Sequence, residues 1–242
     1  MLSTGRFPDR LKFSEIKPIY KKGDKTLITN YRPISLLPVF SKIFEKIIYK
    51  RLYHHLTSNN ILVKEQFGFK CNNSTAIAIY TLINKILSSL NNKIIVSGLF
   101  CDLQKAFDCI NYDTLLSKMK FYSVSGVANK LMESYLRTIY QRVVIYAYNN
   151  SKFSKWEEVQ HGVPKGSVLG PLLFLIYVND LSKSVSDKSS PILYADDTSF
   201  ITANRNETEF QFNTNEIFNE INKWLHSNLL MLNYDKTYIC NS

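Results

Sequence analysis

Apolar residues recur along the chain with two periods, one typical of helices and one typical of strands. The helical period occurs in six stretches. Helices are expected at residues 41–55, 74–90, 113–120, 130–140, 168–178 and 207–225. The first should bury Ile43, Phe44, Ile47, Ile48 and Leu52, the second Ile79, Leu82, Ile83 and Ile86, and the last Phe210, Ile217, Ile221 and Trp224. Asp113 is the expected cap of the third helix, and Pro171 suits the first turn of the apolar fifth.

Shorter apolar runs bounded by turn residues predict strands. They cover residues 11–20, 30–38, 93–102, 142–148, 156–159, 191–195, 198–203 and 229–233. Residues 149–152, with the sequence NNSK, should form a hairpin turn. With no internal repeats, this order predicts an α+β fold with helices packed on a mostly antiparallel sheet.

Composition supports a globular protein of one large domain or two small ones. Of 242 residues, 45% are hydrophobic and 21% charged, and only eight Gly and seven Pro argue against long linkers. Thirty Lys and Arg against 20 Asp and Glu give a net charge of +10. Such an excess favours a polyanionic partner such as nucleic acid, although a soluble basic protein without that partner would look the same.

The compartment is inferred from the cysteines and from the lack of targeting signals. The four cysteines form no C-x-x-C pair, so free thiols in a reducing, intracellular compartment are expected. The start shows no signal peptide. The longest apolar run, residues 168–178, is too short to span a bilayer and contains Gly170 and Pro171. The ends look cut, so we expect a piece of a longer polypeptide.

Two adjacent carboxylates interrupt the apolar stretch SPILYADDTSFI. They are Asp196 and Asp197, and Asp102 follows a second apolar strand 94 residues before Asp196 (196 − 102). Neighbouring strands would bring Asp102 and Asp196 together, where a divalent cation would offset their repulsion. The alternatives are a surface turn for the pair and a helix cap for Asp102.

A glycine- and proline-rich segment lies between these carboxylates. In GVPKGSVLGPLLFLIYVNDL, Gly162, Pro164, Gly166, Gly170 and Pro171 fall within ten residues. Such a loop allows the backbone to approach a ligand closely before a buried helix begins. The alternative is an ordinary connection between a strand and a helix.

The order of six motifs resembles the reverse transcriptases of non-LTR retrotransposons, the Jockey-like group especially. The motifs are PIYKKGDK with NYRPISLLPVFSKIFEKII, QFGFK followed by ST, FCDLQKAFD, GVPKGSVLGPLLFLIYVNDL, YADDTSF and LNYDKT. The resemblance implies a right-hand polymerase fold. It places the fingers at residues 1–92 and 118–160 and the palm at 93–117 and 161–242, with the thumb absent.

The resemblance also implies the roles of individual residues. Asp102 and Asp196 match the principal metal ligands and Asp197 the third carboxylate, for two Mg²⁺ ions that Mn²⁺ can replace. Phe107 matches the aromatic residue that excludes a 2′-hydroxyl, or is only core. The other matched residues are Lys21 and Arg32 at the triphosphate, Lys236 as proton donor to pyrophosphate, and Tyr194 by the primer terminus. The alternatives are a solvated turn for Lys21 and a surface position after a strand for Lys236. Structural roles are expected for Asp108 and Asn179.

One motif departs from the family pattern. The family usually has Pro-Gln-Gly-Ser where this chain has Lys165 before Gly166, two residues expected to contact the nucleotide. The implied activity is DNA synthesis from dNTPs on an RNA template and a DNA primer. No membrane partner is expected, and the expected compartment is the cytoplasm, the nucleus or both. The alternatives are an inactive retrotransposon relic that binds nucleic acid and a viral RNA-dependent RNA polymerase, against which Phe107 argues.

Overall fold

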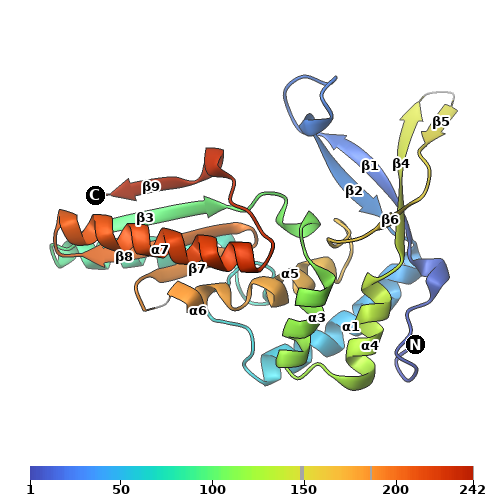
Figure 1. Ribbon diagram of the computed structural model, residues 1–242, viewed down its shortest axis with the longest axis horizontal. Coiled ribbons are helices and arrows are strands. Elements are labelled where there is room, and N and C mark those ends of the chain that lie inside the picture. The colour runs from blue at the N-terminus through green and yellow to red at the C-terminus, as the bar shows by residue number, and fades with distance from the viewer. Residues whose placement is uncertain (148–149, 186, 242) are drawn as a thin grey trace. The chain divides into compact units, whose positions relative to one another are not determined.

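The computed structural model describes residues 1–147, 150–185 and 187–241, and its contacts divide the chain into two compact units (Figure 1). Unit 1 comprises Met1–Asn59 and Ile110–Leu173, and unit 2 comprises Asn60–Cys109 and Phe174–Ser242. Helix α5 (Gly170–Val178) begins in unit 1 and ends in unit 2. Each unit combines helices with a sheet, which confirms the mixed fold class.

The described residues of unit 1 form a five-stranded sheet and three α-helices besides the start of α5. The strand order is β2-β1-β4-β5, and β6 also pairs with β4. β1 pairs antiparallel with β2 and parallel with β4. The elements are β1 (Phe13–Tyr20), β2 (Tyr31–Leu36), α1 (Val39–Ser58), α3 (Tyr112–Phe121), α4 (Gly126–Leu136), β4 (Ile139–Ala147), β5 (Asn150–Phe153) and β6 (Glu157–Val159).

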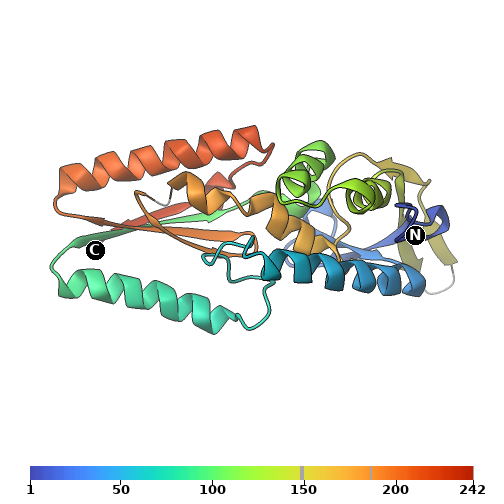
Figure 2. The ribbon, with the colours of Figure 1, turned by 90° about the horizontal axis from the view of Figure 1, so that it is seen from below.

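Unit 2 contains a four-stranded antiparallel sheet with the order β7-β8-β3-β9. Helices α2 and α7 lie on opposite faces of it (Figure 2). On the α2 face, Ala78 packs with Val96, Ile192 and Ile201. The elements are α2 (Thr75–Asn91), β3 (Ile95–Asp102), α6 (Leu181–Val185), β7 (Ser190–Tyr194), β8 (Asp197–Asn204), α7 (Glu207–Ser227) and β9 (Tyr238–Asn241).

The predicted helices exist, but in two of them part of the apolar stripe expected to be buried is exposed. In α1, Ile43 and Ile47 are 47% and 40% exposed, whereas the polar Ser41 and Glu45 are fully buried. In α2, Ile79 is 50% exposed. Both stripes contain more apolar residues than one packing surface can cover, so the tertiary neighbours decide which of them are buried.

Two helix ends also differ from the prediction. The cap of α3 is Asn111, whose side chain accepts a hydrogen bond from the Thr114 N–H, so the assignment to Asp113 was wrong. Helix α4 ends at Leu136 because Thr138 has a φ of +59°, which helix geometry does not allow, and β4 follows. The helix predicted for residues 130–140 therefore has the right length but lies four residues too far along the chain.

The last strand is β9, not residues 229–233 as predicted. That segment passes the end of β3, where Leu232 forms an isolated bridge with Leu103. Its apolar residues Leu230 and Leu232 are buried, which explains the strand-like pattern. In the predicted turn 149–152, residues 150–152 belong to β5, and residue 149 lies outside the described residues.

The compact units divide the chain at other positions than the predicted fingers and palm. Residues 60–92, expected in the fingers, belong to unit 2, because α2 packs on the β3–β7–β8 sheet. Residues 161–173, expected in the palm, belong to unit 1. Among the residues that the structure describes, no helix has both the length and the apolar composition needed to cross a bilayer.

Candidate active site

Three aspartates lie at one end of the unit 2 sheet. Asp102 is the last residue of β3, and its direct partner in the antiparallel ladder is Asp197, the first residue of β8. Directly opposed residues of such a pair carry their side chains on the same face. Asp196 lies in the turn between β7 and β8, after Ala195, whose φ is +56°. The register thus opposes Asp102 to Asp197, and Asp196, expected to lie near Asp102, is the residue directly before Asp197.

The Asp102 carboxylate accepts two hydrogen bonds from the segment between α7 and β9. Asn233 Nδ2 donates to its Oδ2 over 2.9 Å, and Lys236 Nζ donates to the same oxygen over 3.0 Å. The Asn233 N–H also donates to the backbone carbonyl of Asp102. The hydrogen bond and the charge of Asp102 raise the pKa of Lys236. The structure thus brings Lys236 to the carboxylates, although Lys236 and Asp102 are 134 residues apart.

The carboxylates repel one another. Burial raises the pKa of Asp197, and the negative charges of Asp196 and Asp102 raise it further, whereas Lys236 lowers it. A cation between these groups would relieve the repulsion, and carboxylates completed by substrate phosphates are the ligands that Mg²⁺ prefers. In the part of the chain that the structure describes, however, no three His, Cys, Asp or Glu side chains form a group that could hold a metal ion.

Phe107 follows the carboxylate strand in the 3-10 helix Ala106–Asp108. Its ring stacks on Phe174 with the centroids 4.6 Å apart and the planes inclined by 21°, and Phe69 meets it edge-on at 6.0 Å. Phe174 is fully buried, whereas Phe107 is half-buried. Phe107 is therefore part of the core and also keeps an accessible side.

The turn that holds Asp196 is supported by Tyr194. This residue is partly buried against the cluster of Ala78, Val96, Ile192 and Ile201. The Tyr194 hydroxyl accepts a hydrogen bond of 2.7 Å from Thr75 Oγ1 at the start of α2. Helix α2 thus fixes the residue that precedes the acidic turn.

The predicted triphosphate-binding cations lie on the β1–β2 hairpin of unit 1. Arg32 is in β2, directly opposite Ile19 of β1, and Lys21 follows β1. The Lys21 N–H donates to the Asn30 carbonyl over 2.9 Å, which closes the loop between the strands. Both cations are exposed to solvent, as a phosphate contact requires.

The Lys165–Gly166 loop adjoins the same hairpin within unit 1. The Ser35 N–H of β2 donates to the Lys165 carbonyl over 2.7 Å. Gly166 has a φ of +116°, and a Cβ there would lie 2.7 Å from the Ser35 carbonyl oxygen. Only glycine satisfies both conditions without strain. The structure therefore brings Lys165 and Gly166 against the strand that carries Arg32.

Comparison with known proteins assigns the family. A family model described as "Reverse transcriptase (RNA-dependent DNA polymerase)" matches residues 19–242. The chain belongs to the reverse transcriptase family. The relatives below are transposon enzymes, so the resemblance to non-LTR retrotransposon reverse transcriptases is confirmed.

Two relatives come from Drosophila melanogaster. A probable RNA-directed DNA polymerase from transposon BS is 32% identical, over 96% of this chain and 26% of that protein. The RNA-directed DNA polymerase from mobile element jockey is 29% identical, over 98% and 26%. The chain thus spans about a quarter of the length of these curated relatives.

Solved structures share the fold of this reverse transcriptase domain. Apo telomerase from Candida tropicalis, truncated from the C-terminal domain, superposes with a TM-score of 0.65 and 16% identity, over 96% of this chain and 51% of that chain. Telomerase from Candida albicans, in complex with a fragment of telomeric RNA, gives a TM-score of 0.65 at 12% identity. At such identities the likeness shows the fold alone.

Two residues of the reverse transcriptase domain make contacts that the sequence did not predict. Asn233 stands inside the recognised motif LNYDKT, yet nothing local indicates that its side chain reaches Asp102. Glu45 lies in the apolar stretch expected for α1, and a charged residue among positions expected to be buried is the signal that could have identified it. Asn179 has the expected structural role, since it bonds to Val63 N–H and Ile61 C=O.

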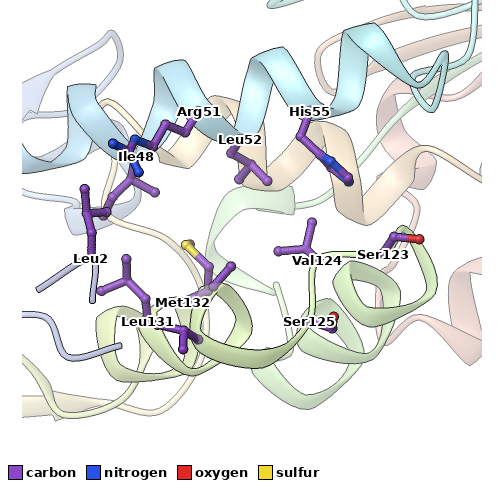
Figure 3. Close-up of a pocket in the computed structure, with 12 residues that line it drawn as sticks. Leu2, Ile48, Arg51, Leu52, His55, Ser123, Val124, Ser125, Leu131 and Met132 are labelled. Carbon is purple, nitrogen blue, oxygen red and sulfur yellow. The ribbon is translucent and has the colours of Figure 1, made fainter. Parts of the chain in front are cut away.

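The cavity drawn in Figure 3 contains none of the predicted site residues. It has a volume of about 420 Å³ and lies in unit 1 between α1 and α4. Ile48 and Leu52 of α1 and Leu131 and Met132 of α4 line it, and His55 Nε2 lies 2.9 Å from the Tyr122 carbonyl oxygen. Its lining is mainly apolar and includes none of the three aspartates.

Proposed function

We propose that this reverse transcriptase domain is an RNA-directed DNA polymerase core that extends the 3′-hydroxyl of a DNA primer with dNTPs on an RNA template. The observation that carries the proposal is the opposition of Asp102 and Asp197 at the end of the β3–β8 ladder, with Asp196 in the adjoining turn. Unit 2 is then the palm and unit 1 the fingers, and none of the described residues is assigned to a thumb.

Asp102, Asp196 and Asp197 are the residues that would hold Mg²⁺, or Mn²⁺ as a substitute. The fit rests on their carboxylate chemistry and on the pKa of Asp197, which burial raises and the neighbouring negative charges of Asp196 and Asp102 raise further. Two such ions, when bound with substrate, supply charge stabilisation for the attacking and leaving oxygens of phosphoryl transfer. Substrate phosphates would complete the ligand set, in keeping with the lack of a three-residue group among the described residues.

Asn233 and Lys236 orient the Asp102 carboxylate. Both donate to Oδ2, so Oδ1 is the oxygen that can take a further ligand. The raised pKa of Lys236 keeps its amine protonated at neutral pH. A protonated amine beside the reacting phosphates can donate a proton to the leaving pyrophosphate, which is the role assigned to Lys236.

The residues proposed to contact the nucleotide are described for each unit separately. In unit 2, the accessible side of Phe107 would lie against the deoxyribose and exclude a 2′-hydroxyl. In unit 1, Arg32 and Lys21 would bind the triphosphate, because an exposed guanidinium and an ammonium are suited to phosphate oxygens. Lys165 and Gly166 would contact the nucleotide from the loop beside β2.

A primer-extension assay with Mg²⁺ or Mn²⁺ tests the proposal. The parent protein should extend a DNA primer on an RNA template with dNTPs, and Asp102→Asn should abolish extension while nearly preserving template binding. Asp187→Asn, which changes an exposed aspartate in the turn after α6, is the matched control and should extend at the parental rate.

Three results would contradict the proposal. Extension by Asp102→Asn at the parental rate would show that this carboxylate has no part in the chemistry. A parent that binds nucleic acid without extending primers under either ion would instead be the inactive relic. Preference for NTPs over dNTPs would indicate an RNA polymerase.

A further inference from the structure

Glu45 is a buried carboxylate in the middle of α1. Its exposure is 0%, and burial raises its pKa. Oε1 accepts a hydrogen bond of 2.9 Å from the Tyr135 hydroxyl of α4, and Oε2 accepts one of 2.5 Å from the Val168 N–H. A leucine of similar size would avoid the cost of burying a charge. What the carboxylate contributes is therefore its bonds to these donors.

The Val168 bond ties Glu45 to the start of α5. The first amides of a helix have no partner within the helix. In the first turn of α5, Gly170 N–H donates to Ser167 Oγ over 2.9 Å and Pro171 has no N–H. Two residues before the helix, Val168 N–H bonds to Glu45. A negative charge at a helix N-terminus is also favourable. Glu45 therefore holds the C-terminal end of the glycine-rich loop.

The other end of the loop is held by β2. Ser35 N–H donates to the Lys165 carbonyl, and the close approach of Gly166 to the Ser35 carbonyl admits no side chain. Lys165 and Gly166 thus lie between an anchor on β2 and an anchor on α1. Without the Glu45 anchor, the loop would keep its contact with β2 but lose its fixed position at α5.

We propose that Glu45 is a positioning residue for nucleotide binding, which sets the place of Lys165 and Gly166 relative to β2 through the Val168 amide. The inference rests on the proposed function, in which this loop contacts the nucleotide. Glu45 itself contacts no substrate.

The test compares variants of Glu45 with a matched control. Glu45→Leu removes the acceptor, whereas Glu45→Gln keeps one carbonyl oxygen that can accept from Val168. Asn129→Leu is the control, because Asn129 is also buried in unit 1 and donates to Leu116 C=O, away from the loop. The measurements are single-nucleotide extension, primer–template affinity and hydrogen exchange of residues 163–170.

Glu45→Leu should raise the KM for dNTP about tenfold, the loss expected for one hydrogen bond to a charged group. Primer–template affinity should stay within about twofold of the parental value, because a residue that positions only the nucleotide loop does not affect the groove that binds the nucleic-acid backbone. Exchange of the Val168 amide should accelerate in Glu45→Leu and stay slow in Asn129→Leu. Glu45→Gln should restore most of the parental KM.

A folded Glu45→Leu with parental KM and parental exchange would overturn the inference, as would an equal rise in KM for Asn129→Leu. If Glu45→Leu does not fold, the hydrogen exchange of the parent protein is the test. The inference requires the Val168 amide to be protected, and fast exchange of this amide would overturn it. A parent without polymerase activity would refute the proposed function, while the exchange comparison would still show whether Glu45 holds the loop.

Discussion

Replacing Phe107 by Val should weaken the discrimination between deoxyribonucleotides and ribonucleotides. The ring is fixed by its stack on the buried Phe174 and by the edge of Phe69, and its remaining side is accessible. Valine would remove the part of the ring that extends beyond Cγ and open space for a 2′-hydroxyl. The parent should therefore favour dNTPs, and Phe107→Val should accept NTPs more readily.

The size of both effects can be estimated from the contacts. A stacked pair such as Phe107 and Phe174 contributes about 0.5–1.5 kcal/mol beyond area burial. Because Phe107 is only half-buried, the total loss of stability should be about 1–3 kcal/mol. Excluding or admitting one small group in a pocket is worth about 10–200-fold in the specificity ratio. The variant should thus stay folded while its specificity changes measurably.

The assay is single-nucleotide extension with dNTP and NTP, from which the ratio of the two kcat/KM values is taken. Phe69→Val is the matched control, because Phe69 belongs to the same aromatic cluster and is 43% exposed. It should lose stability without a change in the ratio. An unchanged ratio in folded Phe107→Val, or an equal shift in Phe69→Val, would refute the reasoning and leave Phe107 as core only.

Three further predictions concern single charges. Lys236→Gln should change stability by less than about 1 kcal/mol, because the Lys236 end of the ion pair is 56% exposed. It should nevertheless slow extension by about 10²–10⁴-fold in pre-steady-state kinetics; a parental rate would exclude Lys236 as proton donor. Lys165→Gln should raise the turnover of primer extension more than it changes nucleotide affinity, and turnover should rise by as much as about 100-fold if alignment of the reacting atoms limits the rate. The salt dependence of nucleotide binding should fall slightly; a Gln variant slower than the parent would contradict this. The folded state raises the pKa of Asp197 above 3.8, so ionising Asp197 lowers stability as pH rises through this range. In EDTA, thermal unfolding should show Asp197→Asn to be more stable than the parent at neutral pH, with the advantage lost below about pH 4; a constant difference would argue against the shift.

Much of the secondary structure follows from local pattern. The apolar strand before Asp102, the turn around Asp196 and the amphipathic α7 are encoded by neighbouring residues, whose spacing matches one backbone period. The family, too, is visible in motif order alone. Helix ends were less predictable, as Asn111 shows, because any of several polar residues near a helix start can cap it.

The order of residues was enough to identify the candidates for the chemistry: three aspartates, Lys236 and the loop around Lys165. That Asp102 faces Asp197 emerged only from the folded chain, because strand register depends on how both strands pack over their whole length. It also decided that Glu45 meets Val168, 123 residues away. Such contacts depend on how distant segments are brought together, and the local spacing of residues contains no information about that.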